Sequence, residues 1–148
     1  MKKMFFAALL FAFAGICAVQ AVAMCKGFES NGVIATPKHF VDNYGAGGRD
    51  SNESYSSERA LREIYYKPFE RCVKEGGATS IMTSYNSIDG VPCACNGHLL
   101  NDILRDEWGF DGFVVSDYSG IDQMQNGLIE KKYTAIVKGI VTSERGTI

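Results

Sequence analysis

The feature that most limits the fold of this chain is the order in which short β-prone segments alternate with amphipathic helical segments. β-prone residues occupy 33–37, 79–86 and 112–117, and apolar residues spaced three and four apart fill the two intervals between them. Strands that alternate with helices in this way form parallel sheets joined by crossover helices. We therefore expect an α/β fold with about three parallel strands.

The first helical interval carries signals for its start, an interruption and its end. Its apolar positions are Leu61, Ile64, Tyr65, Phe69, Cys72 and Val73. We expect Ser56 or Ser57 to cap this helix and Pro68 to kink it, because proline removes one backbone hydrogen bond. Gly76 and Gly77 are expected to end it.

The second helical interval has equally clear limits. Its apolar stripe consists of Leu99, Leu100, Ile103, Leu104 and Trp108. Asn96 is the expected cap, and Gly109 should lie just past the end. The first strand should end at Pro37, because proline cannot donate a hydrogen bond to a neighbouring strand.

Four chemically useful side chains follow the three predicted strands, namely Lys38, His39, Tyr85 and Asp117. Each also has a purely structural interpretation: a solvated lysine, a hydrogen-bonded histidine, a core aromatic ring and a turn-forming aspartate. The carboxyl ends of parallel strands meet at one edge of a sheet, where α/β proteins place their active sites. The convergence of three strand ends therefore favours a functional site.

The amino-terminal segment has the pattern of a secretory signal peptide. Lys2 and Lys3 precede an apolar run over residues 4–19, and Ala21 and Ala23 form a small-residue cleavage motif. We expect cleavage after Ala23, a secreted or periplasmic location, and no membrane attachment afterwards. The alternative is a single membrane anchor, which the short apolar run disfavours.

Composition excludes some partners and leaves others open. Residues 24–148 suffice for one modest domain, and 46% hydrophobic with 22% charged residues is ordinary for a globular protein. A net charge of -2 argues against nucleic acid as a partner.

Residues 121–129 could form a short helix, and no function is assigned to the tail at 124–148.

The cysteines and histidines do not form a metal-binding pattern. The cysteines after the expected cleavage site are Cys25, Cys72, Cys93 and Cys95. They allow three disulfide pairings, and the sequence leaves all three open. The chain has no C-x-x-C motif, and its two histidines, His39 and His98, are far from any paired ligand. We expect no metal and no cofactor.

Five motifs in one order resemble glycoside hydrolase family 3, the β-glucosidase and β-xylosidase group. They are Lys38-His39-Phe40, the loop ending Gly48-Arg49-Asp50, the run from Glu58 to Tyr65 with Pro68-Phe69, Met82-Thr83-Ser84-Tyr85-Asn86 with Gly90-Val91-Pro92, and the run from Trp108 to Asp117. The similarity extends from about Gly32 to about Gln123.

This resemblance implies a retaining glycosidase whose N-terminal domain is a (β/α)8 TIM-like barrel. Asp117 matches the family's nucleophile. Sugar-binding roles are implied for Lys38, His39, Met82, Tyr85 and Tyr118. The implied substrates are oligosaccharides or aryl β-glycosides that carry a terminal β-D-glucosyl or xylosyl residue.

The resemblance also marks departures from the family. A complete barrel needs about 250 residues, so residues 24–148 would form a fragment of one. The family's general acid usually follows the nucleophile in a later domain, and we expect no general acid/base in this chain. We expect the fold to depend on further segments. The alternative function is a catalytically inactive secreted fragment that at most binds sugar.

Overall fold

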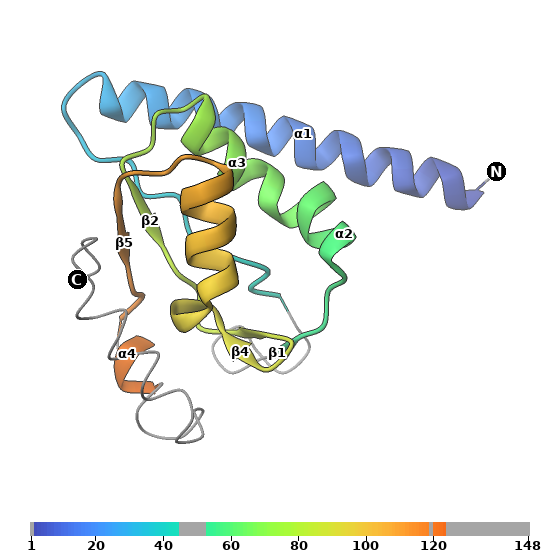
Figure 1. Ribbon diagram of the computed structural model, residues 1–148. Helices are drawn as coiled ribbons and strands as arrows, with labels where there is room; N and C mark the ends of the chain where they lie inside the picture. The colour runs from blue at the N-terminus through green and yellow to red at the C-terminus, as the bar shows by residue number, and fades with distance from the viewer. Residues whose placement is uncertain (1, 45–52, 119, 124–148) are drawn as a thin grey trace.

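A computed structural model describes residues 2–44, 53–118 and 120–123 of the chain (Figure 1). Its helices are α1 (Lys2–Glu29), α2 (Glu58–Ala60), η1 (Leu61–Tyr65), α3 (Tyr66–Lys74), η2 (Cys93–Cys95), η3 (His98–Glu107) and α4 (Gly120–Gln123). Its strands are β1 (Glu53–Ser54), β2 (Ser80–Met82), β3 (Ser87–Ile88), β4 (Val91–Pro92) and β5 (Phe113–Val115).

The centre of the fold is a parallel arrangement of three extended segments, with β2 in the middle. β2 pairs in parallel with β5, so that Met82 lies opposite Val115. On the other side of β2, Phe40 forms a parallel bridge with Thr83. The Phe40 N–H donates to the Met82 carbonyl over 2.8 Å. The predicted three parallel strands and their crossover helices are therefore confirmed.

The predicted limit of the first strand is wrong. Pairing with β2 begins at Pro37 instead of ending there, because the proline carbonyl accepts a hydrogen bond from the Met82 N–H over 3.2 Å. Proline lacks a donor but keeps its acceptor, and this geometry uses only the acceptor. Val33 and Ile34, the expected strand residues, have side chains that are 52% and 55% exposed.

The first crossover starts as predicted and is interrupted before Pro68. The Ala60 N–H donates to the Ser57 hydroxyl over 3.3 Å, which confirms Ser57 as the cap. The wider turn η1 then separates α2 from α3. A proline ring clashes with the carbonyl four residues earlier, here that of Ile64, which lies inside η1. The helix is therefore widened at η1, one turn before the position of the expected kink.

The helix ends follow the predicted signals. Gly77 has φ +68°, and the Ala78 N–H donates to the Cys72 carbonyl over 3.1 Å after α3. In the second crossover, the Leu99 N–H donates to Asn96 Oδ1 over 3.1 Å, and Gly109 has φ +72°. The predicted cap and terminator of both helices are confirmed.

A small second sheet lies beyond the carboxyl end of β2 (Figure 1). β3 and β4 form a hairpin whose turn residues, Asp89 and Gly90, have φ values of 49° and 79°. β1 pairs in parallel with β3. The sequence predicts the turn, because Asp-Gly suits positive φ at both positions, but it does not predict these two-residue strands.

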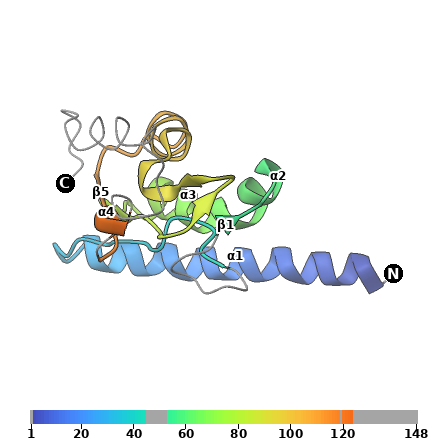
Figure 2. The same ribbon diagram turned by 90° about the horizontal axis from the view of Figure 1, so that it is seen from below.

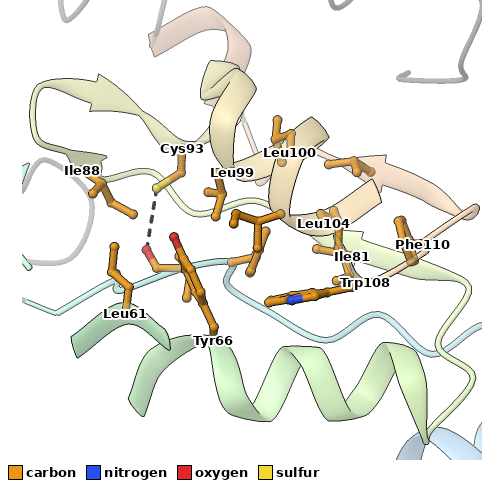
Figure 3. Packing of buried hydrophobic residues seen from close by; sticks show 14 residues of the cluster. Leu61, Tyr66, Ile81, Ile88, Cys93, Leu99, Leu100, Leu104, Trp108 and Phe110 are labelled. Carbon is orange, nitrogen blue, oxygen red and sulfur yellow. Dashed lines mark hydrogen bonds between the residues drawn. The ribbon is translucent and has the colours of Figure 1, made fainter. Parts of the chain in front are cut away.

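One apolar core lies between the parallel sheet and the helices α3 and η3 (Figure 3). The sheet contributes Ile81 and Val114, and η3 contributes Leu99, Leu100, Ile103 and Leu104. Phe40 is completely buried at the centre of an aromatic group. Its ring centroid lies 5.1 Å from that of Phe69 and 5.7 Å from that of Trp108.

Helix α1 passes through the expected cleavage site at Ala23 without a break. Its carboxyl half packs on α3, with Ala18 and Val22 buried, and its amino-terminal part extends beyond the rest of the chain (Figures 1 and 2). Among the residues that the structure describes, no helix meets the length and hydropathy needed to cross a membrane. Cleavage after Ala23 stays a prediction.

Glu29, at the end of α1, ties the amino-terminal edge of the sheet together. Its Oε1 atom accepts hydrogen bonds from the Ala35 N–H at 2.9 Å, the Thr79 N–H at 3.0 Å and the Thr79 hydroxyl at 2.8 Å. These donors stabilise the ionised form, so the bond from Ala35 and those from Thr79 lower the pKa of Glu29. One carboxylate thus connects α1, the first extended segment and the start of β2.

Replacing Phe40 should reveal how much the aromatic group stabilises the fold. Phe40→Ala should reduce the free energy of unfolding by about 3–5 kcal/mol, because a fully buried ring is removed. Urea unfolding monitored by Trp108 fluorescence measures this change. Phe113→Ala is the matched control: Phe113 is 40% exposed, so about 1 kcal/mol is expected. Equal losses of unfolding free energy in Phe40→Ala and Phe113→Ala would contradict the central role of Phe40.

The hydrogen bonds that Glu29 accepts from Ala35 and Thr79 should make the stability of the fold fall at low pH. A carboxyl group whose pKa is lowered by folding contributes stability above its unfolded pKa, and loses that contribution as the pH falls through its folded pKa. Glu29→Gln should therefore lower the thermal unfolding midpoint at about pH 7, and the difference from the unaltered chain should shrink below about pH 4. Glu63→Gln, at a helix-surface ion pair with Arg59, is the control. A constant difference at all pH values would contradict the assignment.

Candidate active site

The candidate site lies on the face of the sheet that the helices leave open. Successive residues of a strand point to opposite faces, and the residues packed against the helices are Phe40, Ile81 and Val114. Their neighbours His39, Met82 and Val115 therefore belong to the other face. His39 and Met82 are each partly exposed. The alternation thus places two of the predicted site residues on one side of the sheet.

The centre of the site is the contact between His39 and Asp117. The distance from His39 Nε2 to Asp117 Oδ2 is 3.0 Å, and the two side chains are 17% and 16% exposed. The imidazole N–H donates to the carboxylate in this geometry. Asp117 lies two residues past the end of β5, at the edge where the sequence predicts it. The partial exposure leaves the pair within reach of a ligand.

The second oxygen of Asp117 is also held. Asp117 Oδ1 accepts a hydrogen bond from the Tyr118 N–H over 2.7 Å. The Asp117 carbonyl accepts another from the Gly120 N–H over 2.9 Å, which closes a turn. Each carboxylate oxygen has more than one acceptor position, so both can still meet a ligand. The result is a carboxylate with a fixed orientation at the end of a strand.

Tyr85 connects the end of the β2 segment to this turn. Its hydroxyl donates a hydrogen bond to the carbonyl oxygen of Tyr118. The ring of Tyr118 is 87% exposed. The structure therefore brings four of the predicted site residues together, because His39 and Tyr118 both contact Asp117 and Tyr85 holds Tyr118.

The other two predicted residues lie beside this group. Lys38 immediately precedes His39 and is exposed, and the Lys38–His39 peptide bond is cis. Met82 connects the sheet through its backbone, since its N–H and carbonyl bond to Pro37 and Phe40 respectively. The sugar-binding roles of Lys38 and Met82 stay predictions.

Asn86 is a positioning residue that the site prediction missed. Its side chain is almost completely buried, and Nδ2 lies 3.1 Å from the carbonyl oxygens of Val41 and Asp42 and 3.2 Å from Ser54 Oγ. The amide therefore joins the loops that follow the first strand and β2 to β1. An asparagine next to Tyr85 in a turn-like stretch gives no sign in the sequence that it is buried.

Asp42 belongs to the same buried polar group. Burial raises the pKa of Asp42, and hydrogen bonds with Ser56, Ser54 and Tyr65 offset part of this rise. Asp42 also has φ 57°, in the left-handed region that aspartate tolerates better than most residues. This polar backbone lies three residues after His39.

Two further contacts fix the backbone around the site. Cys93 Sγ lies 3.6 Å from the Val41 carbonyl oxygen, as the dashed line in Figure 3 shows. At the start of β5, a Cβ atom on Gly112 would lie 2.2 Å from the Thr79 carbonyl oxygen. A larger residue at position 112 would therefore push β5 away from β2 and move Asp117.

Within the described parts of the chain, no group of three or more histidine, cysteine, aspartate or glutamate residues could hold a metal ion. The chemistry that the described residues offer is that of an oriented carboxylate beside an imidazole and exposed aromatic and cationic groups. Such a carboxylate can act as a nucleophile, as a proton acceptor or as a hydrogen-bond acceptor for hydroxyl groups.

The family model described as Glycosyl hydrolase family 3 N terminal domain matches residues 14–139. Beta-glucosidase A of Butyrivibrio fibrisolvens is 48% identical over 104 residues, which are 70% of this chain and 12% of that protein. A beta-xylosidase of Formosa agariphila is 46% identical over 117 residues, which are 76% of this chain and 16% of that protein.

A solved structure shows the same similarity. The structure of a β-glucosidase, EmGH1, from Erythrobacter marinus superposes with a TM-score of 0.76 at 31% identity, over 88% of this chain and 18% of that one. The matched part of the chain therefore spans only 12% to 18% of the length of these relatives. Its three parallel strands and crossover helices are part of a TIM-like barrel. On the family match and these identities, the chain belongs to glycosyl hydrolase family 3, as a portion of its N-terminal domain.

Proposed function

We propose that this chain carries the nucleophile of a retaining glycoside hydrolase, and that the nucleophile is Asp117. The observation that supports the proposal best is the 3.0 Å contact between His39 Nε2 and Asp117 Oδ2 at the carboxyl end of β5. Active sites of barrel enzymes lie at this end of the strands. The β-glucosidases and the β-xylosidase among the relatives suggest terminal β-D-glucosyl or xylosyl residues as the substrate.

The proposed reaction proceeds in two displacements. An Asp117 oxygen attacks the anomeric carbon, the bond to the leaving oxygen breaks, and a second carboxyl group protonates that oxygen. The second carboxylate then takes a proton from water, whose oxygen attacks the anomeric carbon, and the bond to Asp117 breaks to release the sugar. Hydrogen bonds from His39 and the Tyr118 N–H hold the carboxylate in place before the attack, so the chemical step does not need to order it.

We propose that the general acid lies outside the described residues. The glutamates on or next to the crossover helices form ion pairs with arginine and lysine side chains: Glu58 and Glu107 with Arg62, Glu63 with Arg59, Glu70 with Lys67 and Lys74, and Glu75 with Arg71. Of the two aspartates of η3, Asp102 pairs with His98 and Asp106 is exposed. These groups stabilise the outer helices. A retaining enzyme needs its second carboxyl group about 5–5.5 Å from the nucleophile, on the open face of the sheet.

The side chains around Asp117 suggest how the sugar is held. Lys38 can donate hydrogen bonds to sugar hydroxyl groups, His39 would line the same subsite beside Asp117, and the exposed ring of Tyr118 offers a stacking surface. Met82 and Tyr85 would line the same subsite. Because the Tyr85 hydroxyl donates to the Tyr118 carbonyl, its oxygen faces a bound sugar mainly as an acceptor.

We also propose that the chain is exported, to the periplasm or the medium. Lys2 and Lys3 with the apolar run and the Ala21/Ala23 motif support this. The packing of α1 on α3 argues against removal of this segment, because Ala18, which precedes Ala23, is only 1% exposed.

The mass of the exported chain tests the proposed processing. The chain should be recovered outside the cytosol with an intact mass that corresponds to Met24 as its first residue. Ala23→Leu should block the shortening, because a bulky residue does not fit a small-residue cleavage motif, whereas Ala18→Leu, away from the motif, should leave it unchanged. Full-length chain that stays in the cytosol would contradict the export proposal.

Replacement of Asp117 tests the proposed nucleophile. Residues 14–139 can replace the matching segment of a full-length family 3 β-glucosidase, which supplies the other parts of the enzyme. The chimaera should hydrolyse an aryl β-glucoside, and a mechanism-based fluoroglucoside should label Asp117. Asp117→Asn should lower kcat by roughly 10³-fold or more and abolish the label.

Asp106→Asn is the matched control, because Asp106 is exposed on η3. It should change neither kcat nor labelling. An active chimaera in which Asp117→Asn is still labelled would refute the nucleophile assignment. A chimaera that binds glucose in calorimetry without hydrolysing the aryl glucoside would favour the alternative, a sugar-binding fragment without catalysis.

A further inference from the structure

Two buried thiols meet where α1 packs on α3. Cys25 in α1 is 5% exposed and Cys72 in α3 is 1% exposed. With Ala35 and Ala78 they form an apolar cluster separate from the main core. Residues 25 and 72 come from helices that are far apart in sequence and lie side by side in both views (Figures 1 and 2). A covalent link between them would therefore fix the position of α1.

The local geometry brings the two cysteines into direct contact. Both side chains are buried in the same apolar cluster. Gly76 makes this approach possible: a Cβ atom built on it would lie 2.9 Å from the Cys25 Cβ and 3.1 Å from the Cys72 Cα. Both cysteines thus adjoin one small space that a larger residue would fill. The two distances together place the Cys25 Cβ no more than 6.0 Å from the Cys72 Cα, and a disulfide requires such a close approach of the two backbones.

The other cysteines occupy different environments. Cys93 lies in the main core with its sulfur against the Val41 carbonyl. Cys95 follows it in η2 and is also buried, while Cys17 is exposed on α1. All five cysteines are reduced in this structure. The shared cluster and the close approach at Gly76 favour a link between Cys25 and Cys72, with Cys93 and Cys95 left unpaired.

We propose that Cys25 and Cys72 form a disulfide that links α1 to α3 when the chain folds in an oxidising compartment. The oxidant is a small or protein disulfide. One cysteine thiolate attacks a sulfur of the oxidant, forms a mixed disulfide and releases one thiol. The thiolate of the other cysteine then attacks the mixed disulfide and releases the second thiol. The two cysteines lose two electrons and two protons, and the oxidant is reduced to two thiols.

Burial determines when this link forms. Burial raises the pKa of the Cys72 thiol to about 12, and it raises the pKa of Cys25 as well. The thiolate is the reactive form, so the docked helices slow the exchange, and the disulfide forms when the contact between α1 and α3 opens briefly. It closes a loop of about 45 residues, a size at which cross-linking restricts the unfolded chain considerably.

The link also bears on processing of the amino terminus. Cys25 follows the expected cleavage site at Ala23, so it is kept whether or not residues 1–23 are removed. Cleavage would remove Ala18 and Val22, which are buried residues of α1. The disulfide would then hold the remaining turn of α1, including Glu29, against α3. The pairing itself depends on the fold and not on export, so it can be tested in vitro.

Peptide mapping of the refolded chain tests the pairing. The full 148-residue chain is refolded in a glutathione redox buffer, free thiols are alkylated, and peptides are analysed by mass spectrometry without reduction. A single linked pair containing Cys25 and Cys72 is expected, with Cys93 and Cys95 alkylated after final denaturation. The same buffer with concentrated urea is the control and should give mixed pairings. Mixed pairings in both buffers, or alkylation of both Cys25 and Cys72 after refolding, would overturn the proposal.

Thermal unfolding gives a second readout. The oxidised chain should unfold at a higher temperature than the same chain with a reducing agent. Cys72→Ser should abolish this difference, whereas Cys17→Ser, at an exposed cysteine, should keep it. A difference that persists in Cys72→Ser would show that other cysteines cause it and would overturn the assignment.

Discussion

The burial of Phe40 is the interaction on which the rest of the structure depends. Its backbone N–H and carbonyl are both used in pairing with the β2 segment, at 2.8 Å from Met82 and from Ser84 respectively. Its ring lies among Phe69, Trp108 and Tyr66. One residue therefore connects the first extended segment, the sheet and both crossovers. Because neighbouring residues of an extended segment face opposite sides, fixing Phe40 in the core fixes His39 on the open face.

The same logic applies at the other strand ends. Val114 is 4% exposed and packs against the helices, and three residues later Asp117 meets His39. The close approach at Gly112 sets the position of β5 relative to β2. The geometry of the candidate site therefore comes from packing on the opposite side of the sheet. This explains why a run of apolar residues and a glycine belong to the same motif as a carboxylate.

Much of this could be predicted from the sequence, because periodicity and end signals are local. The helix caps at Ser57 and Asn96, the glycine terminators, the parallel order and the meeting of His39, Tyr85 and Asp117 were predicted. The predictions fail where contacts between distant segments determine the strand limits and the burial of a side chain. Pro37 begins the pairing because β2 uses its carbonyl, and Glu29 takes the amide of Ala35 away from any strand. The short β1–β3 pairing and the burial of Asn86 depend on loops meeting in space, which no local pattern encodes.

The buried amide of Asn86 has a consequence for any ligand that binds at this edge of the sheet. Since one side chain holds the backbone of Val41 and Asp42 together with Ser54, these loop segments cannot rearrange independently without leaving a buried amide unsatisfied. The proposed binding surface is therefore ordered before a ligand arrives. A sugar would then lose its own freedom of motion on binding while the protein loses little, which is the thermodynamic advantage of a preorganised site.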